Sequence, residues 1–310
     1  MIGMPGLRVA VAIADAGGIR AAAERLGRSP SAVSMMLRQM EAELGAALFE
    51  GGRRAHPTRL GQQVLNEARD VIAHFDRAAA AIRAFAGTEA GQCDIACVPS
   101  VAVAFMPAAI LKLRATAPLL AVQVRDMDSR AAVEAVAKGA VDAAFASLSR
   151  PTPDLSLMPV LADRLDVVCR ADDRLARVKH PLPWRALLGR RFLANGSYGG
   201  VVNPEFLATA RAAHLQVRNV TSLLAMVRVG VGITVLPRLC RLQGEAGLCF
   251  VPVEDPEAVR VLSLITRAGR AQPPGSMRLA SAVLEVARAR ETELSYKLLL
   301  APEASPGAIA

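Results

Sequence analysis

Residues 17–34 read Gly-Gly-Ile-Arg-Ala-Ala-Ala-Glu-Arg-Leu-Gly-Arg-Ser-Pro-Ser-Ala-Val-Ser. This stretch predicts two short helices joined by a tight turn, because Gly27 ends the first helix. Ser29 suits the cap of the second helix, where its hydroxyl accepts an orphan amide hydrogen bond. Pro30 suits the first helical position, where a missing amide donor costs nothing. The second helix should reach about Leu44, and an earlier helix from about Leu7 should end at the glycine pair.

A basic turn at residues 51–57 follows, and from Leu60 the sequence predicts one long helix. Apolar residues recur along this helix at alternating intervals of four and three, which is typical of a coiled coil. The seam consists of Val64, Ala68, Val71, Phe75, Ala78, Ile82 and Phe85. We expect this seam to form a dimer, and the alternative is a helix that packs on its own domain.

Helix, turn, helix and basic turn in this order predict a winged helix-turn-helix, whose second helix would enter the DNA major groove. Hydroxyl, thioether and guanidinium groups on this helix could reach base edges, and arginines elsewhere could reach phosphates. The candidate DNA-binding residues are Arg20, Ser29, Pro30, Ser31, Ser34, Met35, Arg38, Arg53 and Arg54.

Two of these candidates have a simpler interpretation. One of Met35 and Met36 must face the core, so either could be the exposed residue. Arg38 could pair with an acidic neighbour on its own helix, Glu41 or Glu43, instead of DNA. Both alternatives remain open from the sequence.

The run 17–34, together with residues 39–45, Leu48-Phe49, Arg53-Arg54 and residues 58–61, resembles the signature of LysR-type transcriptional regulators over residues 7–65. The sequence departs from that pattern at Pro30, Met35-Met36 and Gly51, where the family more often has Gln, polar residues and Arg. The recognition surface is therefore less polar than is usual. We expect readout through thymine methyl groups and DNA shape.

After a short linker at residues 87–91, strand and helix patterns alternate. Strands are expected at residues 94–98, 120–125, 141–147, 165–170, 191–194, 232–236 and 259–266, and helices at 103–117, 129–138, 204–214, 222–229 and 276–299. This alternation predicts an α/β fold with mostly parallel sheets. Residues 94–100, 106–107, 138–145 and 226–237 resemble segments of the LysR effector domain.

The resemblance implies an α/β fold class with an N-terminal all-α winged helix-turn-helix, a long linker helix and a periplasmic-binding-protein-like effector domain. The boundaries expected are 1–58 for DNA binding, 59–90 for the linker helix and 91–300 for the effector domain, with a disordered tail at 301–310. Subdomain one would comprise 91–161 and 267–300, and subdomain two 162–266. A ligand cleft would lie between them.

Ligands of α/β sheets bind at the carboxyl ends of strands, where helix N-termini offer amide donors. Polar residues at such positions are the candidate effector ligands: Ser100, Val101, Ser129, Asn195, Gly196, Ser197, Thr221 and Ser222. These groups could hold a carboxylate or another small anion. The simpler interpretation is that each hydroxyl only caps a helix.

The composition and the cysteine pattern argue against a membrane-spanning protein and against a secreted, disulfide-linked protein. Hydrophobic residues make up 53% of the 310, so the chain can build sizeable cores, and the net charge of +9 favours an anionic partner. The first 90 residues hold 11 arginines against 9 acidic residues, so the surplus is not concentrated there. Five cysteines without paired or zinc-binding spacing fit a reducing cytosol, and their spacing gives little support for redox sensing. No stretch suggests a membrane span or a signal peptide.

No metal spacing, nucleophile elbow or acid–base pair indicates catalysis, so neither an enzyme nor a cofactor is expected. The sequence instead predicts a cytoplasmic, homodimeric or homotetrameric regulator that binds double-stranded DNA and a small-molecule effector. A solute-binding module without DNA contacts and an enzyme of solute-binding fold are the competing hypotheses. Effector identity, operator and direction of regulation are not predicted.

Overall fold

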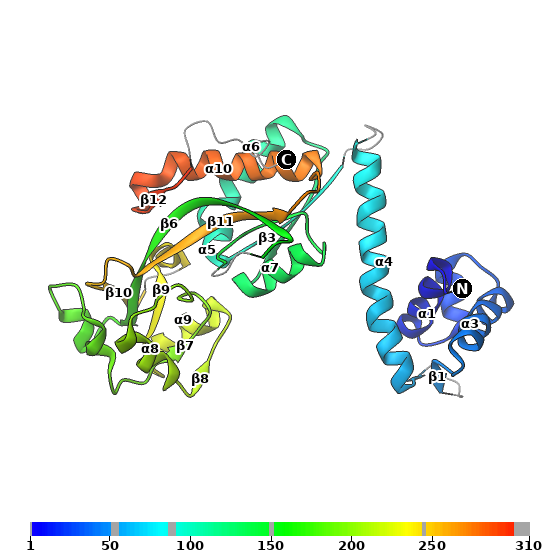
Figure 1. Ribbon diagram of the computed structural model, residues 1–310, viewed down its shortest axis with the longest axis horizontal. Helices are drawn as coiled ribbons and strands as arrows, with labels where there is room; N and C mark the ends of the chain where they lie inside the picture. Colours follow the sequence, from blue (N-terminus) through cyan, green and yellow to red (C-terminus); the bar gives the residue numbers. More distant parts are fainter. Residues whose placement is uncertain (1, 51–55, 86–90, 149–151, 244–245, 301–310) are drawn as a thin grey trace. The chain divides into compact units, whose positions relative to one another are not determined.

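The computed structural model describes residues 2–50, 56–85, 91–148, 152–243 and 246–300. The chain forms two compact units that divide at Ile82/Arg83, within the long helix (Figure 1). The described part contains no helix long and apolar enough to cross a membrane. Arg53 and Arg54, the linker from residue 87 and the tail at 301–310 lie outside the described residues.

The N-terminal unit is built from the three helices that the sequence predicts: α1 (Met4–Ala16), α2 (Ile19–Leu26) and α3 (Pro30–Leu44). Each ends at a glycine in the left-handed region, namely Gly17, Gly27 and Gly45. Their inner faces share one core, which includes Ile13, Val33 and Leu48. A short antiparallel pair, β1 (Phe49–Glu50) and β2 (His56–Pro57), forms the base of the wing.

The long helix α4 (Arg59–Phe85) begins against this core because Gly61 leaves room for it. A Cβ at Gly61 would lie 1.9 Å from the carbonyl oxygen of Leu48. Thr58 fixes the same junction: its amide donates to the Leu48 carbonyl, and its hydroxyl accepts from the Gly61 amide at 3.0 Å. Residues 58–61 thus join the wing to the long helix.

The expected seam of α4 divides into two parts. Ala68 is buried within the chain and Val64 packs on the N-terminal core, so these two residues follow the alternative of packing on their own domain. Beyond them Val71, Phe75 and Ile82 are 45%, 50% and 70% exposed. Ala78 is exposed too, and the Phe85 side chain lies outside the described residues.

Ion pairs hold α1 against α4: Arg69 Nη2 lies 2.6 Å from Asp15 Oδ1, and Arg8 pairs with Asp76. All four side chains are about half exposed, so we expect each pair to contribute little to stability. The pairs nevertheless orient the helix on the N-terminal unit.

The second unit begins with three neighbouring strands: β3 (Gln92–Cys97), flanked by β4 (Ala121–Asp126) and β5 (Ala143–Ala146). All three run parallel. The helices α5 (Pro99–Ala104), α6 (Met106–Thr116), α7 (Ser129–Ala137) and α10 (Pro274–Leu294) accompany this part. Helix α7 contacts β5 and β3, whereas α10 contacts α6 and β3.

The expectation of mostly parallel sheets is wrong for the strands that pair with the long strand β6 (Leu155–Arg170), although the short strands β7 (Leu193–Ala194) and β8 (Leu215–Gln216) do pair parallel. Strand β6 pairs antiparallel with β11 (Val259–Arg267), β10 (Leu248–Pro252), β9 (Thr234–Pro237) and β12 (Lys297–Leu298). The sequence pattern failed because β6 enters and β11 returns between the same two subdomains, and such strands must run in opposite directions.

Strands β6 and β11 connect two sets of hydrophobic cores. Leu161 and Leu262 belong to the core under β3–β5, whereas Leu165 and Ala258 belong to the core of the second subdomain. The chain therefore returns at about residues 258–262, earlier than the expected residue 266. The second subdomain also contains η1 (Arg174–Arg177), η2 (Trp184–Leu187), β7 (Leu193–Ala194), α8 (Pro204–Arg211), β8 (Leu215–Gln216), α9 (Val220–Arg228) and η3 (Arg238–Gln243).

Candidate DNA interface and effector cleft

Ser29 caps α3 as the sequence predicts. Its hydroxyl accepts the Ala32 amide at 3.2 Å, and its Oγ lies 3.0 Å from Ser31 Oγ. Pro30 occupies the first turn. The cap and the glycine turn before it fix where α3 begins, and hence which side chains its exposed first turns present.

One face of α3 is open to solvent. Ser31, Met35 and Arg38 are exposed, and their spacing of four and three residues places them on one side of the helix. Met35 is 67% exposed, whereas Met36 packs on the core, so Met35 is the outward residue of the two. Ser34 is half-buried beside this face.

Arg38 makes no ion pair with any residue that the structure describes. Glu41, one acidic candidate, instead accepts the Leu48 amide at 2.8 Å and ties the end of α3 to the wing. Arg20 is likewise exposed, at the start of α2. Sequence reasoning did not select Arg28, an exposed residue of the α2–α3 turn whose Nη1 lies 3.5 Å from Met36 Sδ.

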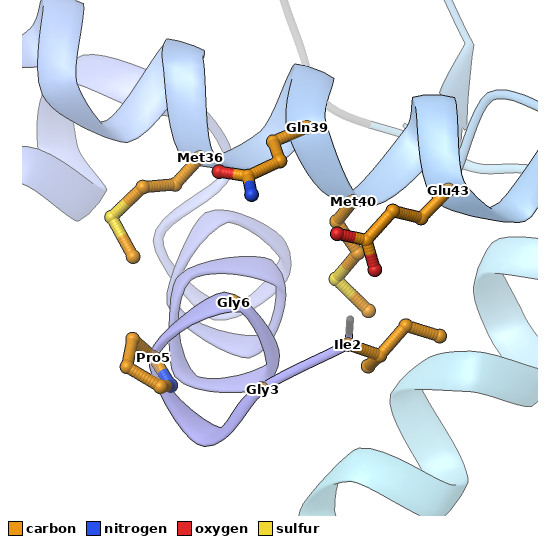
Figure 2. A pocket seen from close by; sticks show the side chains of 8 residues that line it. All are labelled: Ile2, Gly3, Pro5, Gly6, Met36, Gln39, Met40 and Glu43. Carbon is orange, nitrogen blue, oxygen red and sulfur yellow. The ribbon is translucent and has the colours of Figure 1, made fainter.

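A hollow of about 200 Å³ lies between α3 and the first turn of α1. Figure 2 shows Met36, Gln39, Met40 and Glu43 reaching from α3 toward Ile2, Gly3, Pro5 and Gly6. Met36 and Gln39 directly follow Met35 and Arg38 in the sequence, so they are rotated from these two residues by roughly 100° around the helix. The hollow therefore lies beside the exposed face and leaves it unobstructed.

In the second unit, polar groups gather beyond the carboxyl ends of the parallel strands. Ser100 in α5 follows β3, Ser129 opens α7 after β4, and Ser147 follows β5. The Ser129 hydroxyl accepts the Ser147 amide at 3.1 Å. The Ser147 hydroxyl is buried and has no hydrogen-bond partner among the described residues. The sequence pattern predicts Ser147 only as the end of a strand and does not mark it as a ligand.

A buried arginine joins this edge to the crossover strands. Arg260 Nη2 in β11 donates to Ser100 Oγ at 3.0 Å and to Asp163 Oδ2 in β6 at 3.1 Å. Arg260 and Asp163 side chains are 6% and 0% exposed. Asp163 Oδ1 and Arg260 Nε are buried without a partner among the described residues. Such unsatisfied buried groups are rare in native structures.

Burial raises the pKa of Asp163 to about 6, against the opposing effects of Arg260 and the Leu239 amide. Asp166, three residues further along β6, is also fully buried and accepts two hydrogen bonds from Arg238 at 2.9 and 3.0 Å. Arg241 Nη2 lies 3.3 Å from the same carboxylate. Two carboxylates and three guanidinium groups thus meet where β6, β11 and η3 adjoin α5.

Several expected effector ligands have other roles. The Val101 side chain belongs to the core, and its amide donates to Val98. The Asn195 amide group binds Thr234 Oγ1 and the Val235 carbonyl, and its oxygen accepts the Ser197 amide. Asn195 is therefore a buried link between β7 and β9. The sequence could not show this because its partners lie about forty residues away.

The remaining candidates lie on the second subdomain. Gly196, Thr221 and Ser222 are exposed, and Ser197 is half-buried. Helix α9 is capped by Asn219, whose side chain accepts the Ser222 amide at 2.9 Å. Just before this cap, Arg218 Nη1 lies 3.9 Å from Asp128 Oδ2, the cap of α7 in the first subdomain. This pair therefore joins one residue of each subdomain.

The described residues contain no group of three or more His, Cys, Asp or Glu side chains that could hold a metal ion. They also show no nucleophile, base and orienting group in hydrogen-bond contact. The arrangement can bind and orient a polar molecule through hydroxyl groups and one buried guanidinium.

Comparison with known proteins matches both units. Residues 5–62 match the model of the bacterial regulatory helix-turn-helix protein, lysR family, and residues 86–290 match the LysR substrate binding domain. The uncharacterized HTH-type transcriptional regulator YbhD of Escherichia coli strain K12 is 24% identical over 287 residues, 90% of either chain. The hydrogen peroxide-inducible genes activator of Haemophilus influenzae is 25% identical, covering 89% of this chain and 94% of its own.

Among solved structures, full-length CbnR complexed with its target DNA aligns with a TM-score of 0.67. That alignment covers 92% of this chain and all of the CbnR chain, at 20% sequence identity. The two chains therefore share the fold of both units.

Proposed function

Because the chain belongs to the LysR family of bacterial transcriptional regulators, we propose that α3 reads promoter DNA and that a small anion bound at the Ser100–Arg260 edge modulates this binding. The observation that carries the DNA-binding part is the Ser29-capped helix with Ser31, Met35 and Arg38 on its open face. The relatives are named as a transcriptional regulator and as a genes activator, so we infer regulation without catalysis. A regulator of promoters would act in the cytoplasm.

The DNA contacts that we propose divide by chemistry. Ser31, Ser34 and Met35 would face base edges, whereas Arg20, Arg53 and Arg54 would reach the phosphates. Ser29 and Pro30 would set the depth of the helix in the groove. With an exposed thioether at its centre, this face favours contacts to thymine methyl groups. Selection of binding sites from random DNA tests this: A·T-rich half-sites support it, and half-sites specified by guanines contradict it.

We propose that a second copy covers the exposed seam of α4. An apolar groove of about 330 Å³, lined by Leu7, Leu60, Val64 and Val71 among others, leads from the N-terminal core to the start of that seam. Phe75 and Ile82 continue it along the helix. A row of large exposed apolar side chains at heptad spacing is the pattern of a coiled-coil interface. Paired α3 helices would then read half-sites about 34–36 Å apart on an interrupted inverted repeat.

The effector site that we propose lies beyond the carboxyl ends of β3, β4 and β5. The hydroxyl groups of Ser100, Ser129 and Ser147 would donate to a carboxylate or another small anion, and Arg260 would supply the countercharge. The unpartnered Ser147 hydroxyl and Arg260 Nε support a ligand here. Ser197, Thr221 and Ser222 of the second subdomain would complete the site as the subdomains close.

Thermal-shift screening of small carboxylates and aromatic acids tests this site, since a ligand of the native state raises its melting temperature. A ligand that stabilises the full chain should lose that effect in Ser100→Ala. Ser281→Ala is the matched control, because the Ser281 hydroxyl only bonds the Met277 carbonyl of its own helix. Equal stabilisation of both variants would place the ligand elsewhere, and stabilisation only by cations would contradict the anion site.

A further inference from the structure

Strand pairing brings together two cysteines that lie far apart in the sequence. In the antiparallel pair of β6 and β10, Cys169 and Cys249 are direct register partners. Both residues adjoin the same hydrophobic cluster of the second subdomain, so their side chains extend from the same face of the sheet. No other two of the five cysteines, all of which the structure describes, stand opposite each other on paired strands.

The register also gives the separation of the two residues. The Ala171 amide donates to the Gly247 carbonyl, one pair beyond Arg170 and Leu248. Hydrogen-bonded pairs recur at every second residue of an antiparallel ladder, so Cys169 and Cys249 form such a pair, with Cα atoms about 5.5 Å apart. Disulfides span Cα separations of about 4.4–6.8 Å.

We propose that Cys169 and Cys249 form a dithiol that a hydroperoxide oxidises to a cross-strand disulfide, which makes this sheet a redox-modification site. In a hydrogen-bonded pair the Cβ atoms start about 5.5 Å apart and must approach by about 1 Å to form the bond. A bond formed under such strain is readily reduced, as regulatory disulfides are. The site rests on the strand register and is independent of the DNA and effector sites.

The exposure of the two thiols gives the order of the steps. Cys169 is fully buried and Cys249 is partly exposed, so a peroxide meets Cys249 first. Burial raises the pKa of the Cys169 thiol to about 12, with Asp173 and Cys249 adding to the effect, so Cys169 is poorly suited to attack first. We therefore expect slow oxidation, with Cys169 as the resolving thiol.

In the first step the Cys249 thiolate takes one peroxide oxygen, the O–O bond breaks, and the alcohol or water leaves after gaining a proton. In the second step Cys169 Sγ attacks Cys249 Sγ, the S–O bond breaks, and the hydroxide leaves as water with the Cys169 thiol proton. The two thiols together lose two electrons, which reduce the peroxide. The new bond links β6, the strand that enters the second subdomain, to β10.

The test uses the reduced full-length chain, treated with hydrogen peroxide and digested without reductant. Mass spectrometry should find the peptides of Cys169 and Cys249 joined, and titration of the denatured chain should show that two of its five thiols are lost. Dithiothreitol should restore both thiols. On non-reducing gels the oxidised chain should migrate as a single subunit.

Cys249→Ser should abolish the joined peptides, and Cys249→Ala serves if the serine variant does not fold. Cys240→Ser is the matched control because Cys240 belongs to a different core cluster, and this variant should still lose two thiols. The proposal is overturned if the oxidised native chain yields no joined Cys169–Cys249 peptide, if its crosslinks form between subunits, or if Cys249 reaches the sulfinic state while Cys169 stays reduced.

Discussion

Glycine is required at position 61 for a steric reason that the sequence alone does not show. A side chain there would meet the Leu48 carbonyl at 1.9 Å, so wing and long helix could not keep their contact. We predict that Gly61→Ala destabilises the chain by about 1–3 kcal/mol, measured as a lower urea midpoint. Gly18→Ala is the control, because nothing lies within 4 Å of a Cβ there. Equal midpoints for both variants would contradict the packing argument.

Arg38 is exposed on the open face of α3, and we predict that it contacts DNA. Arg38→Ala should weaken binding to promoter DNA by about 1–3 kcal/mol, and the salt dependence should lose about one counterion if the contact is a phosphate. Fluorescence anisotropy at several salt concentrations measures both. Arg211→Ala on α8 removes the same charge from the other unit and should change neither quantity.

Asp163 couples the fold to pH. Its pKa of about 6 lies above the ordinary 3.8, so the native chain binds this proton more tightly than the unfolded chain does. The stabilising contribution of the proton bound to Asp163 is complete below about pH 4 and is lost as the pH rises through 6. We predict that the unfolding free energy of the native sequence, relative to Asp163→Asn, falls by about 1–3 kcal/mol from pH 4 to 7. A difference that is constant with pH would show that Asp163 does not titrate there.

Much of the site could be read from single residues, and the rest depends on distant partners. The Ser29 cap and the glycine stops act within a few residues, so their pattern predicted α1, α2 and α3. Arg260, by contrast, lies 160 residues from Ser100 and 97 from Asp163. Local pattern cannot show such a contact, and the same holds for the link between Asn195 and Thr234.

On the scale of helices and strands, α4 serves two different surfaces. Its first turns complete the N-terminal core, whereas its later seam residues remain exposed. We predict that Ile82→Glu weakens the dimer by about 2 kcal/mol or more, as the loss of a central apolar contact does. Sedimentation at several concentrations measures this. Ala73→Glu introduces the same charge off the seam and should leave the dimer intact.

Periodicity predicted most elements but not their pairing. The strands β3, β4 and β5 and the helix α7 lie within about two residues of their expected positions. Strand β6 begins ten residues before the expected Leu165, and β10 was missed altogether. Both strands owe their conformation to partners across the sheet, and that tertiary contribution overrides local preference.

At the scale of the whole molecule, the chain divides into two compact units, of which one carries the helix that we propose reads DNA and the other carries the proposed effector site. The crossover strands β6 and β11 carry the buried Asp163–Arg260 pair where the two subdomains join. Closure around a ligand would therefore change the surroundings of these charges. We therefore expect effector binding at the proposed site to affect the second subdomain through these charges.

Competition binding measures whether α3 recognises DNA specifically. Labelled DNA from upstream of the chain's own gene is titrated with the full-length protein, against unlabelled copies of the same sequence or a shuffled one. We predict that the native sequence competes at least about 10³-fold better than the shuffled sequence. Equal competition by both sequences would mean that α3 does not recognise this DNA specifically.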